Sequence, residues 1–188
     1  MRIKESEGLK LTGRWRLTAR HIDTGQEIIK EGKEVLLSNK LPEPWRFSGR
    51  EGKNSDEVII KEGKNLIVTI AKAFVGKMLI DTSGYDTGLT YQAIGTGTTA
   101  VAVGDIKLTT ETARKAITTK SLSTNEITLS TFLTAAESTY NIKEAGVFGH
   151  STASASANTG VLFSHWLVSF DNSGGSYDIT IDYILTIG

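Results

Sequence analysis

The chain has 188 residues, which is enough for one domain or for one domain with a smaller appendage. It contains no cysteine, which excludes disulfide bonds and thiolate zinc sites. Lysine and arginine together number 21, as do aspartate and glutamate, so no strong overall field draws the protein to nucleic acid or to an anionic membrane.

The sequence does not predict a targeting or membrane segment. The start, MRIKESEGLK, is charged and has no apolar stretch, so we expect no secretory signal peptide. The longest apolar run, residues 66–80, is interrupted by Lys72 and Lys77 and is too short to cross a bilayer. Abundant glycine (19 residues) with scarce proline (2 residues) favours strands joined by tight turns.

The N-terminal part predicts a β-hairpin. Trp15, Leu17 and Ala19 alternate with arginine and threonine, which is typical of a strand with one buried and one basic face. The turn-forming triplet Asp-Thr-Gly at residues 23–25 follows, and an extended pattern then resumes. Residues 41–55 carry both prolines together with glycines and charges, which indicates an exposed loop.

Residues 65–79 are the best candidate for a helix. The apolar residues that recur there at helical spacing, and so predict its buried side, are Ile67, Ile70, Phe74 and Met78. Asn65 is a suitable residue to cap the start of this helix.

After this helix the pattern changes to short extended segments. Strands are expected at residues 89–94, 127–134 and 142–148, and residues 110–118 predict either a strand or a short helical turn. Residues 149–160, GHSTASASANTG, have almost nothing to bury. We therefore expect a segment there that is mobile or is ordered by a partner.

The end of the chain predicts a long hairpin. Residues 162–170 are strongly apolar, residues 171–176 have turn composition, and residues 178–187 alternate between apolar and polar side chains. Strands at this spacing predict a mainly β fold, an antiparallel β-sandwich with one α-helix and an N-terminal β-hairpin extension. We divide the chain into a hairpin and loop region, 1–63, and a helix plus β-sandwich domain, 64–188.

The segment IGTGTTAVAVGDIKLTTE, residues 94–111, has the first two glycines of a dinucleotide-binding loop. Such a loop has a third glycine, or an alanine, and a helix directly after it. Ala100 stands at the third position, but the residues after it do not begin a helix, and no Gly-Lys-Ser or Gly-Lys-Thr follows. We therefore interpret Gly95 and Gly97 as a turn between strands.

The triplet Asp-Thr-Gly occurs twice and offers the sharpest enzymatic alternative. Aspartic proteases use two such triplets to bring two carboxylates together around a water molecule. Here Asp23 and Asp86 lie close in sequence for a two-lobed enzyme, and Gln26 and Leu89 follow the triplets where a small residue is typical. Both triplets are therefore interpreted as turns, and an aspartyl hydrolase remains a distant alternative.

The three histidines do not form a recognisable metal or nucleophile motif. His21, His150 and His165 have no partner at helical spacing, and no Gly-x-Ser-x-Gly occurs. His165 lies in an apolar stretch and is expected to be a packed histidine. A metal-dependent hydrolase with ligands from loops is a second distant alternative. We predict no catalytic, cofactor-binding or metal-binding residue, and no cofactor.

Two binding functions fit the composition poorly. The basic strand face of Arg14, Arg16 and Arg20 has few aromatic neighbours, whereas a nucleic-acid surface combines a wide basic footprint with stacking rings. We interpret it as a solvated face or a charged contact with a partner subunit. A carbohydrate-binding module needs exposed rings on one face, but the rings expected in loops are Trp45, Tyr85 and Tyr140.

Three segments resemble structural proteins of tailed-bacteriophage virions. They are Asn65-Leu66-Ile67, then YQAIGTGTT running into Gly104-Asp105 and Leu108, and finally IKEAGVF followed by a Ser/Ala-rich loop and VLFSHW. Such proteins often show an Ile-Gly-x-Gly turn, a Gly-Asp-x-x-Leu step, a Glu-Ala-Gly-Leu-Phe-like strand and a final apolar hairpin. Val147 stands here in place of the leucine. The resemblance covers residues 60–188 and carries over no catalytic residue.

This resemblance implies a non-enzymatic virion structural protein that assembles by subunit contacts in the tail, near the fibre or baseplate or as tail decoration. A capsid decoration or cement protein is the alternative. The expected partners are copies of itself, in a symmetric trimer or hexamer, and other virion structural proteins, with no membrane or nucleic acid. The protein is expected in the virion after synthesis in the host cytoplasm, with residues 41–55 and 149–160 as contact arms.

Overall fold

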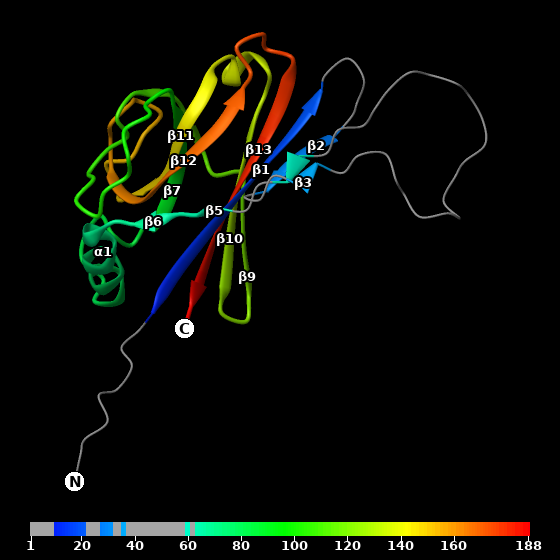
Figure 1. The fold of residues 1–188 in the computed structure, drawn as a ribbon. Helices are drawn as coiled ribbons and strands as arrows, with labels where there is room; N and C mark the ends of the chain where they lie inside the picture. The colour runs from blue at the N-terminus through cyan, green and yellow to red at the C-terminus, as the bar shows by residue number, and fades with distance from the viewer. Residues whose placement is uncertain (1–9, 22–26, 32–34, 37–58, 61–62) are drawn as a thin grey trace, which may run out of the picture.

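Two antiparallel β-sheets packed face to face form the protein (Figure 1). The computed structural model describes residues 10–21, 27–31, 35–36, 59–60 and 63–188. The prediction of a mainly β sandwich is confirmed, and one α-helix accompanies the strands in these residues.

Neighbouring strands in each sheet come from distant parts of the sequence. The first sheet contains, in spatial order, β2 (Glu27–Glu31), β1 (Leu11–His21), β13 (Tyr177–Ile187), β10 (Glu126–Leu133) and β9 (Thr119–Ser123), and β5 (Gly63–Lys64) also pairs with β1. The second sheet contains β6 (Leu66–Ile67), β12 (Val161–Asp171), β11 (Asn141–Gly149), β7 (Leu89–Gly95) and β8 (Glu111–Ala116). A third, two-stranded sheet pairs β3 (Val35–Leu36) with β4 (Ile59–Ile60). The helix α1 (Thr69–Leu79) packs against β12, and the 3-10 helix η1 (Ala136–Ser138) leads from β10 to β11.

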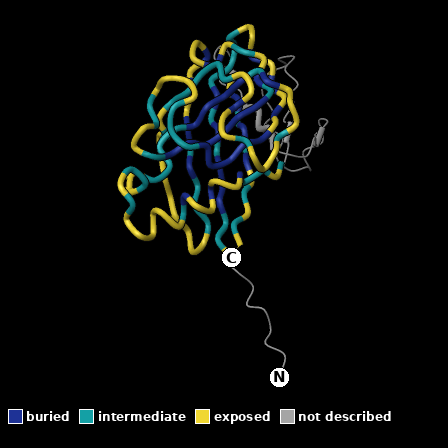
Figure 2. Tube along the Cα trace, turned by 90° about the vertical axis from the view of Figure 1, so that its left-hand side faces the viewer, coloured by how far each residue is buried: buried dark blue, intermediate teal, exposed yellow. Residues whose placement is uncertain are grey.

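The core lies between the two large sheets and is dominated by aromatic rings (Figure 2). Trp166 of β12 stacks on both Trp15 of β1 and Tyr183 of β13, with ring centroids 6.5 and 6.0 Å apart. Phe163 meets Tyr183 edge to face, and Phe74 of α1 meets Phe163 in the same way. Burial of a phenylalanine stabilises by about 1.5–3 kcal/mol, so Phe74 anchors the helix to the sandwich.

The helix begins later than its sequence pattern predicts, and its buried side agrees with the predicted one at Phe74 but not at Ile70 or Met78. Asn65 does not cap it, because Leu66 and Ile67 continue as strand β6 and the helix starts at Thr69. The Thr69 amide donates instead to the carbonyl oxygen of Val103, 2.8 Å away. The buried positions are Val68, Ala71 and Phe74, whereas the predicted Ile70 and Met78 are 39% and 42% exposed.

The predicted C-terminal hairpin is wrong, because its two strands belong to different sheets. β12 pairs with β11 and β6, whereas β13 pairs with β1 and β10. The apolar faces of β12 and β13 therefore cover each other across the core, as the stacking of Trp166 on Tyr183 shows. The turn between them is a corner that carries the chain from one sheet to the other.

Asn172 holds this corner. Its side chain is buried, and its amide nitrogen donates to the carbonyl oxygens of Ser138 and Tyr177 and to the Ser138 hydroxyl at 2.9–3.1 Å. Its amide oxygen accepts from the Tyr177 backbone amide at 3.1 Å. One side chain thus satisfies backbone groups of the corner and of η1, which would otherwise be buried without partners.

Residues 149–160, whose composition predicts a mobile or partner-ordered segment, make hydrogen bonds to other parts of the chain itself. Arg114 of β8 donates to the backbone oxygen of Thr159, pairs with Glu111 at 2.7 Å, and lies 3.9 Å from the ring centre of Phe148. Both charged side chains are almost fully buried. The small loop residues contribute little apolar area, but the backbone oxygen and the hydroxyl of Thr159 both accept hydrogen bonds from the guanidinium. Residues 41–55 lie entirely outside the described part of the chain.

The predicted basic face of β1 belongs to a surface of mixed charge. Trp15, Leu17 and Ala19 are buried, so the arginines between them lie on the outer face of the first sheet. In register, Asp182 lies opposite Arg16 and Asp178 lies opposite Arg20, while Arg14 pairs with Glu126 of β10 at 2.9 Å. Carboxylates on neighbouring strands therefore balance the arginines, as on a solvated face.

We expect the variant Asn172→Ala to lose about 2–3 kcal/mol of unfolding free energy, because several buried backbone groups lose their partner. Chemical denaturation monitored by tryptophan fluorescence measures this loss. Ser176→Ala in the same corner is the matched control and should change stability by less than about 0.5 kcal/mol. Equal, small effects of the two variants would show that Asn172 does not hold the corner.

Candidate functional site

The loop between β7 and β8 is fastened to one buried carboxylate. Glu144 of β11 is fully buried and accepts hydrogen bonds from the backbone amides of Gly97 (3.1 Å), Thr109 (2.9 Å) and Thr110 (2.6 Å). A bare carboxylate in the interior costs several kcal/mol, and these hydrogen bonds offset that cost. Both ends of the loop are thereby drawn to the same side chain.

Gly95 and Gly97 are glycines because the Glu144 carboxylate lies where a side chain would project. A Cβ atom at Gly95 would lie 2.6 Å from Glu144 Oε1 and even closer to the carbonyl oxygen of Thr110. A Cβ atom at Gly97 would collide with the same carboxylate oxygen. Gly95 ends strand β7 and Gly97 lies in the long loop that leads to β8, so the two glycines do not form the turn that was predicted. The anion that they accommodate is a side chain of the protein itself.

His165 of β12 connects Glu144 to Asp105 in the loop. Its Nε2 lies 3.0 Å from Glu144 Oε2, and its Nδ1 lies 2.7 Å from Asp105 Oδ2. An ionised carboxylate only accepts hydrogen bonds, so a ring that is protonated at both nitrogens satisfies both contacts. Asp105 also accepts from the Ala102 amide at 2.9 Å. We call Asp105, Glu144 and His165 the carboxylate–histidine cluster.

The carboxylate–histidine cluster is built to hold the loop rather than to react. Each oxygen of Glu144 accepts two hydrogen bonds, and both ring nitrogens of His165 already have a carboxylate partner. Glu144 and His165 are buried, and only the Asp105 side chain, at 25% exposure, reaches the surface. A general acid, base or metal ligand needs a free position directed at its substrate or ion, and Glu144 and His165 do not offer one.

Of the two Asp-Thr-Gly triplets, the described residues include the one at residues 86–88. Asp86 lies in an exposed turn, where its carboxylate accepts from the Thr87 amide at 3.1 Å and the Thr87 hydroxyl donates to the Gly84 carbonyl oxygen. The interpretation of this triplet as a turn is confirmed. Asp23 lies outside the described residues.

The predicted packing of His165 is confirmed, but its two carboxylate partners were not predicted. His150 lies at the start of residues 149–160, with its ring 4.6 Å from that of Tyr85 and its Nδ1 2.9 Å from the Thr152 hydroxyl. The side chain of His21 is not described. Among the described residues, no three histidine, aspartate or glutamate side chains gather as a metal site.

One signal in the sequence could have identified Glu144. Glu144 is a lone carboxylate in a strand, and the residues that follow it, Ala145, Gly146 and Val147, are small or apolar. In the structure all three are buried. A charge at a buried strand position needs hydrogen-bond donors close by. The glycine-rich loop, whose amides are not covered by large side chains, is a natural source of such donors.

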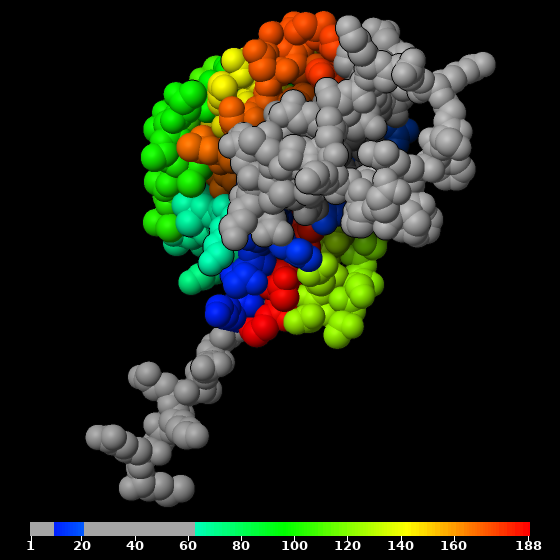
Figure 3. Space-filling view, turned by 45° about the vertical axis from the view of Figure 1, so that its right-hand side comes forward, coloured from blue at the N-terminus to red at the C-terminus, as the bar shows by residue number. Residues whose placement is uncertain are grey.

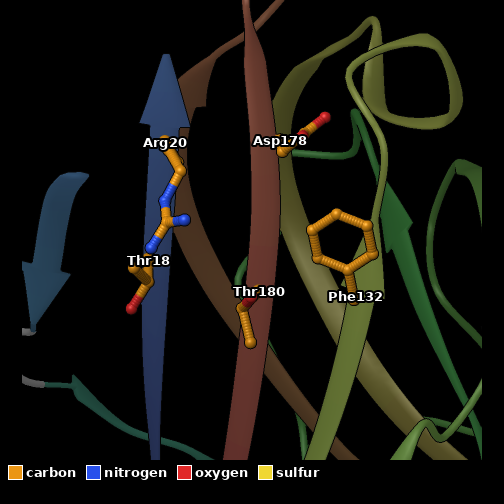
Figure 4. Close-up of a pocket in the computed structure, with 5 residues that line it drawn as sticks. All are labelled: Thr18, Arg20, Phe132, Asp178 and Thr180. Carbon is orange, nitrogen blue, oxygen red and sulfur yellow. The ribbon is translucent and has the colours of Figure 1, made fainter. Parts of the chain in front are cut away.

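A small hollow with mixed polar and apolar lining lies on the outer face of the first sheet (Figure 4). It encloses about 270 Å³ and is lined by Thr18, Arg20, Phe132, Asp178 and Thr180. The Asp178 carboxylate already accepts from the Ala135 amide at 2.7 Å. The hollow is smaller than a typical ligand pocket, and it suits a side chain of a neighbouring molecule better than an enclosed ligand.

Within the described residues, the helices are too short or too polar to cross a membrane. No protein-family model matches the chain, and no match was found among curated proteins or among solved structures.

Glu144→Gln tests the cluster directly. Glutamine keeps the shape of the side chain, but its amide nitrogen cannot accept a hydrogen bond as the second carboxylate oxygen does. Some of the backbone amides, or the His165 ring, therefore lose a hydrogen-bond acceptor. We expect a loss of about 3–5 kcal/mol in unfolding free energy, measured by chemical denaturation at neutral pH.

Glu137→Gln is the matched control for this substitution. Hydrogen bonds from Lys115 and Thr134 lower the pKa of Glu137 to about 2, so it is ionised at neutral pH, yet it lies at the surface. This change should cost less than about 1 kcal/mol. A loss at Glu144 no larger than that at Glu137 would contradict the role given to the buried carboxylate.

Proposed function

We propose that the chain is a non-enzymatic structural protein of a tailed-bacteriophage virion. It acts by contacts with copies of itself, in a symmetric trimer or hexamer, and with other virion proteins. Its position is in the tail, near the fibre or baseplate. The observation that supports this proposal most directly is the arrangement of the segments that resemble virion structural proteins.

These segments, distant in sequence, lie on adjacent strands of the second sheet. Asn65-Leu66-Ile67 leads into β6, VLFSHW is in β12, IKEAGVF is in β11, and YQAIG is in β7. The strand order β6-β12-β11-β7 therefore places the strand segments of the resemblance side by side in one sheet (Figure 1). A pattern that came together by chance would have no reason to be contiguous in space.

The residues of the motifs also contact one another. Gly95 and Gly97 leave room for the side chain of Glu144, and Asp105 forms a hydrogen bond with His165. The buried Leu108 packs against Gly146, where an added Cβ atom would lie 2.9 Å from Cδ2 of Leu108. The motifs thus contact one another through space left by glycines, a hydrogen bond and an apolar side chain. The side chains best suited to chemistry are used to hold the fold, which suits a building block whose function is contact.

Exposed apolar side chains provide surfaces for such contacts. Leu79 and Ile80 at the end of α1 are 79% and 76% exposed, and Val103 and Ile106 in the β7–β8 loop are exposed as well. Adjacent exposed apolar residues of this size are typical of places where a neighbouring subunit packs.

Purified phage particles from the host that carries this gene test the proposal. We expect mass spectrometry to find the chain in many copies per particle, and cryo-electron microscopy to show the two-sheet domain in symmetric positions on the tail. Density on the capsid surface would instead support the decoration alternative. Absence of the chain from purified, infectious particles would contradict a virion role.

A further inference from the structure

Strand β9 forms one edge of the first sheet, and its outer side is open. It pairs with β10, and no other described strand pairs with it. All residues of Thr119–Ser123 are exposed. Figure 1 shows the β9–β10 hairpin extending past the strands of the second sheet, and Figure 3 shows its yellow-green residues at the margin of the molecule. An open strand edge of this kind is a template for pairing with another strand.

The free backbone groups on this edge belong to Lys120 and Leu122. In an antiparallel pair, alternate residues exchange hydrogen bonds with the neighbouring strand, and the residues between them direct their amides and carbonyls to the other side. The Ile187 amide donates to the carbonyl oxygen of Asn125, so odd-numbered residues here bond towards β13 and the even-numbered residues of β10 bond towards β9. These even-numbered residues pair with the odd-numbered residues of β9. The backbone groups of Lys120 and Leu122 therefore point outwards.

The side chains of Lys120 and Leu122 lie on the core-facing side of the sheet but beyond the core itself. In the register with β10 they are opposite Leu129 and Ile127, and Leu129 is buried. The Leu122 side chain is nevertheless 69% exposed. A strand added at this edge would remove part of this apolar surface from water.

The sequence of β9, Thr-Lys-Ser-Leu-Ser, is complementary to itself in antiparallel order. When two copies pair about Ser121, Lys120 of each copy faces Leu122 of the other, and every residue of the strand gains a partner. A register centred on Lys120 would bring two like charges directly opposite each other, which is destabilising. A register centred on Leu122 would extend the pairing into the turn at Thr124, whose φ of 54° is not extended. Charge and strand length thus select one register.

We propose that the open edge of β9 binds the same edge of a second copy of this chain, so that two first sheets join into one continuous antiparallel sheet. The contact is two-fold symmetric about Ser121. The outward amides and carbonyls of Lys120 in each copy bond to those of Leu122 in the other. This inference names one contact of the self-assembly proposed above and rests on that proposal.

A two-fold contact distinguishes between the two proposed assemblies. A trimer closes about a three-fold axis alone and has no place for a surface that binds itself, whereas a hexamer made of two trimers has such a place. One pair of short strands buries little area, so the contact is weak between isolated chains and is strengthened where many copies are held together. The inference therefore predicts the hexamer, with pairs of β9 strands between its two trimers.

Cysteine cross-linking tests the contact on the full-length protein, which has no cysteine of its own. In the proposed register the two copies of residue 121 form a non-hydrogen-bonded pair with Cα atoms about 4.5 Å apart, which is within the range of a disulfide. Ser121→Cys should therefore give a disulfide-linked dimer on oxidation with diamide, measured by non-reducing gel electrophoresis.

Ser123→Cys is the matched control, because residues 121 and 123 are both exposed serines on the same face of the same strand. In the proposed register the two copies of residue 123 are separated by about 13 Å along the strand direction, which is too far for a disulfide. We expect Ser123→Cys to cross-link at least about tenfold more slowly than Ser121→Cys.

The charge at position 122 tests the register. In the Ser121→Cys background, Leu122→Glu places a carboxylate opposite Lys120 of the other copy, whereas Leu122→Lys places a second ammonium group there. The formal net charge of the chain is zero, so the two variants carry net charges of equal size and repel their own copies equally at long range. Position 122 is exposed, so neither change threatens the fold. We expect Leu122→Glu to cross-link at least about fivefold faster than Leu122→Lys.

Several results would overturn the proposal. They are equal cross-linking of Ser121→Cys and Ser123→Cys, no cross-linking of either, and equal rates for the two charge variants. Sedimentation velocity supplies a second readout, because an assembly that Leu122→Lys splits into halves supports the contact, and an assembly that this change leaves intact contradicts it. None of these results depends on finding the chain in phage particles, so the contact and the virion role fail separately.

Discussion

A carboxylate shielded from water organises the second sheet of this protein. Glu144 gathers three backbone amides of the β7–β8 loop and the ring of His165, so that β11, β12 and the loop share one polar centre. Because an unpaired buried charge is costly, every partner must be in place for any of them to be stable there. This requirement accounts for the path of the loop, for glycine at positions 95 and 97, and for the direction in which the His165 side chain of β12 points.

Glycine spacing of the kind that cradles phosphate therefore serves here to hold an internal anion. The physical reason is the same in both cases, since amides without neighbouring side chains can approach a negatively charged oxygen. The difference is that Glu144 already fills the position. The motifs that resemble virion structural proteins therefore build a stable scaffold here, in which apolar side chains such as that of Leu79 remain exposed.

The sequence predicted what depends on local alternation. The strands β7, β10, β11, β12 and β13 lie where their patterns place them, and the fold class follows from their number and spacing. Alternation shows which face of a strand is buried, but not which sheet the strand joins, so the corner at Asn172 was mistaken for a hairpin turn. The helix was placed too early because Ile67 suits a strand and a helix equally well. The partners of Glu144 and His165 could not be predicted, because they come from segments far away in the chain.

Hydrogen exchange of individual backbone amides, followed by NMR, tests the central claim most directly. If Glu144 holds the loop, the amides of Gly97, Thr109 and Thr110 exchange as slowly as those of the core strand β11, while the exposed neighbours Thr98 and Thr99 exchange rapidly. Exchange of Gly97, Thr109 and Thr110 at the rate of Thr98 and Thr99 would show that the buried carboxylate does not organise this part of the protein.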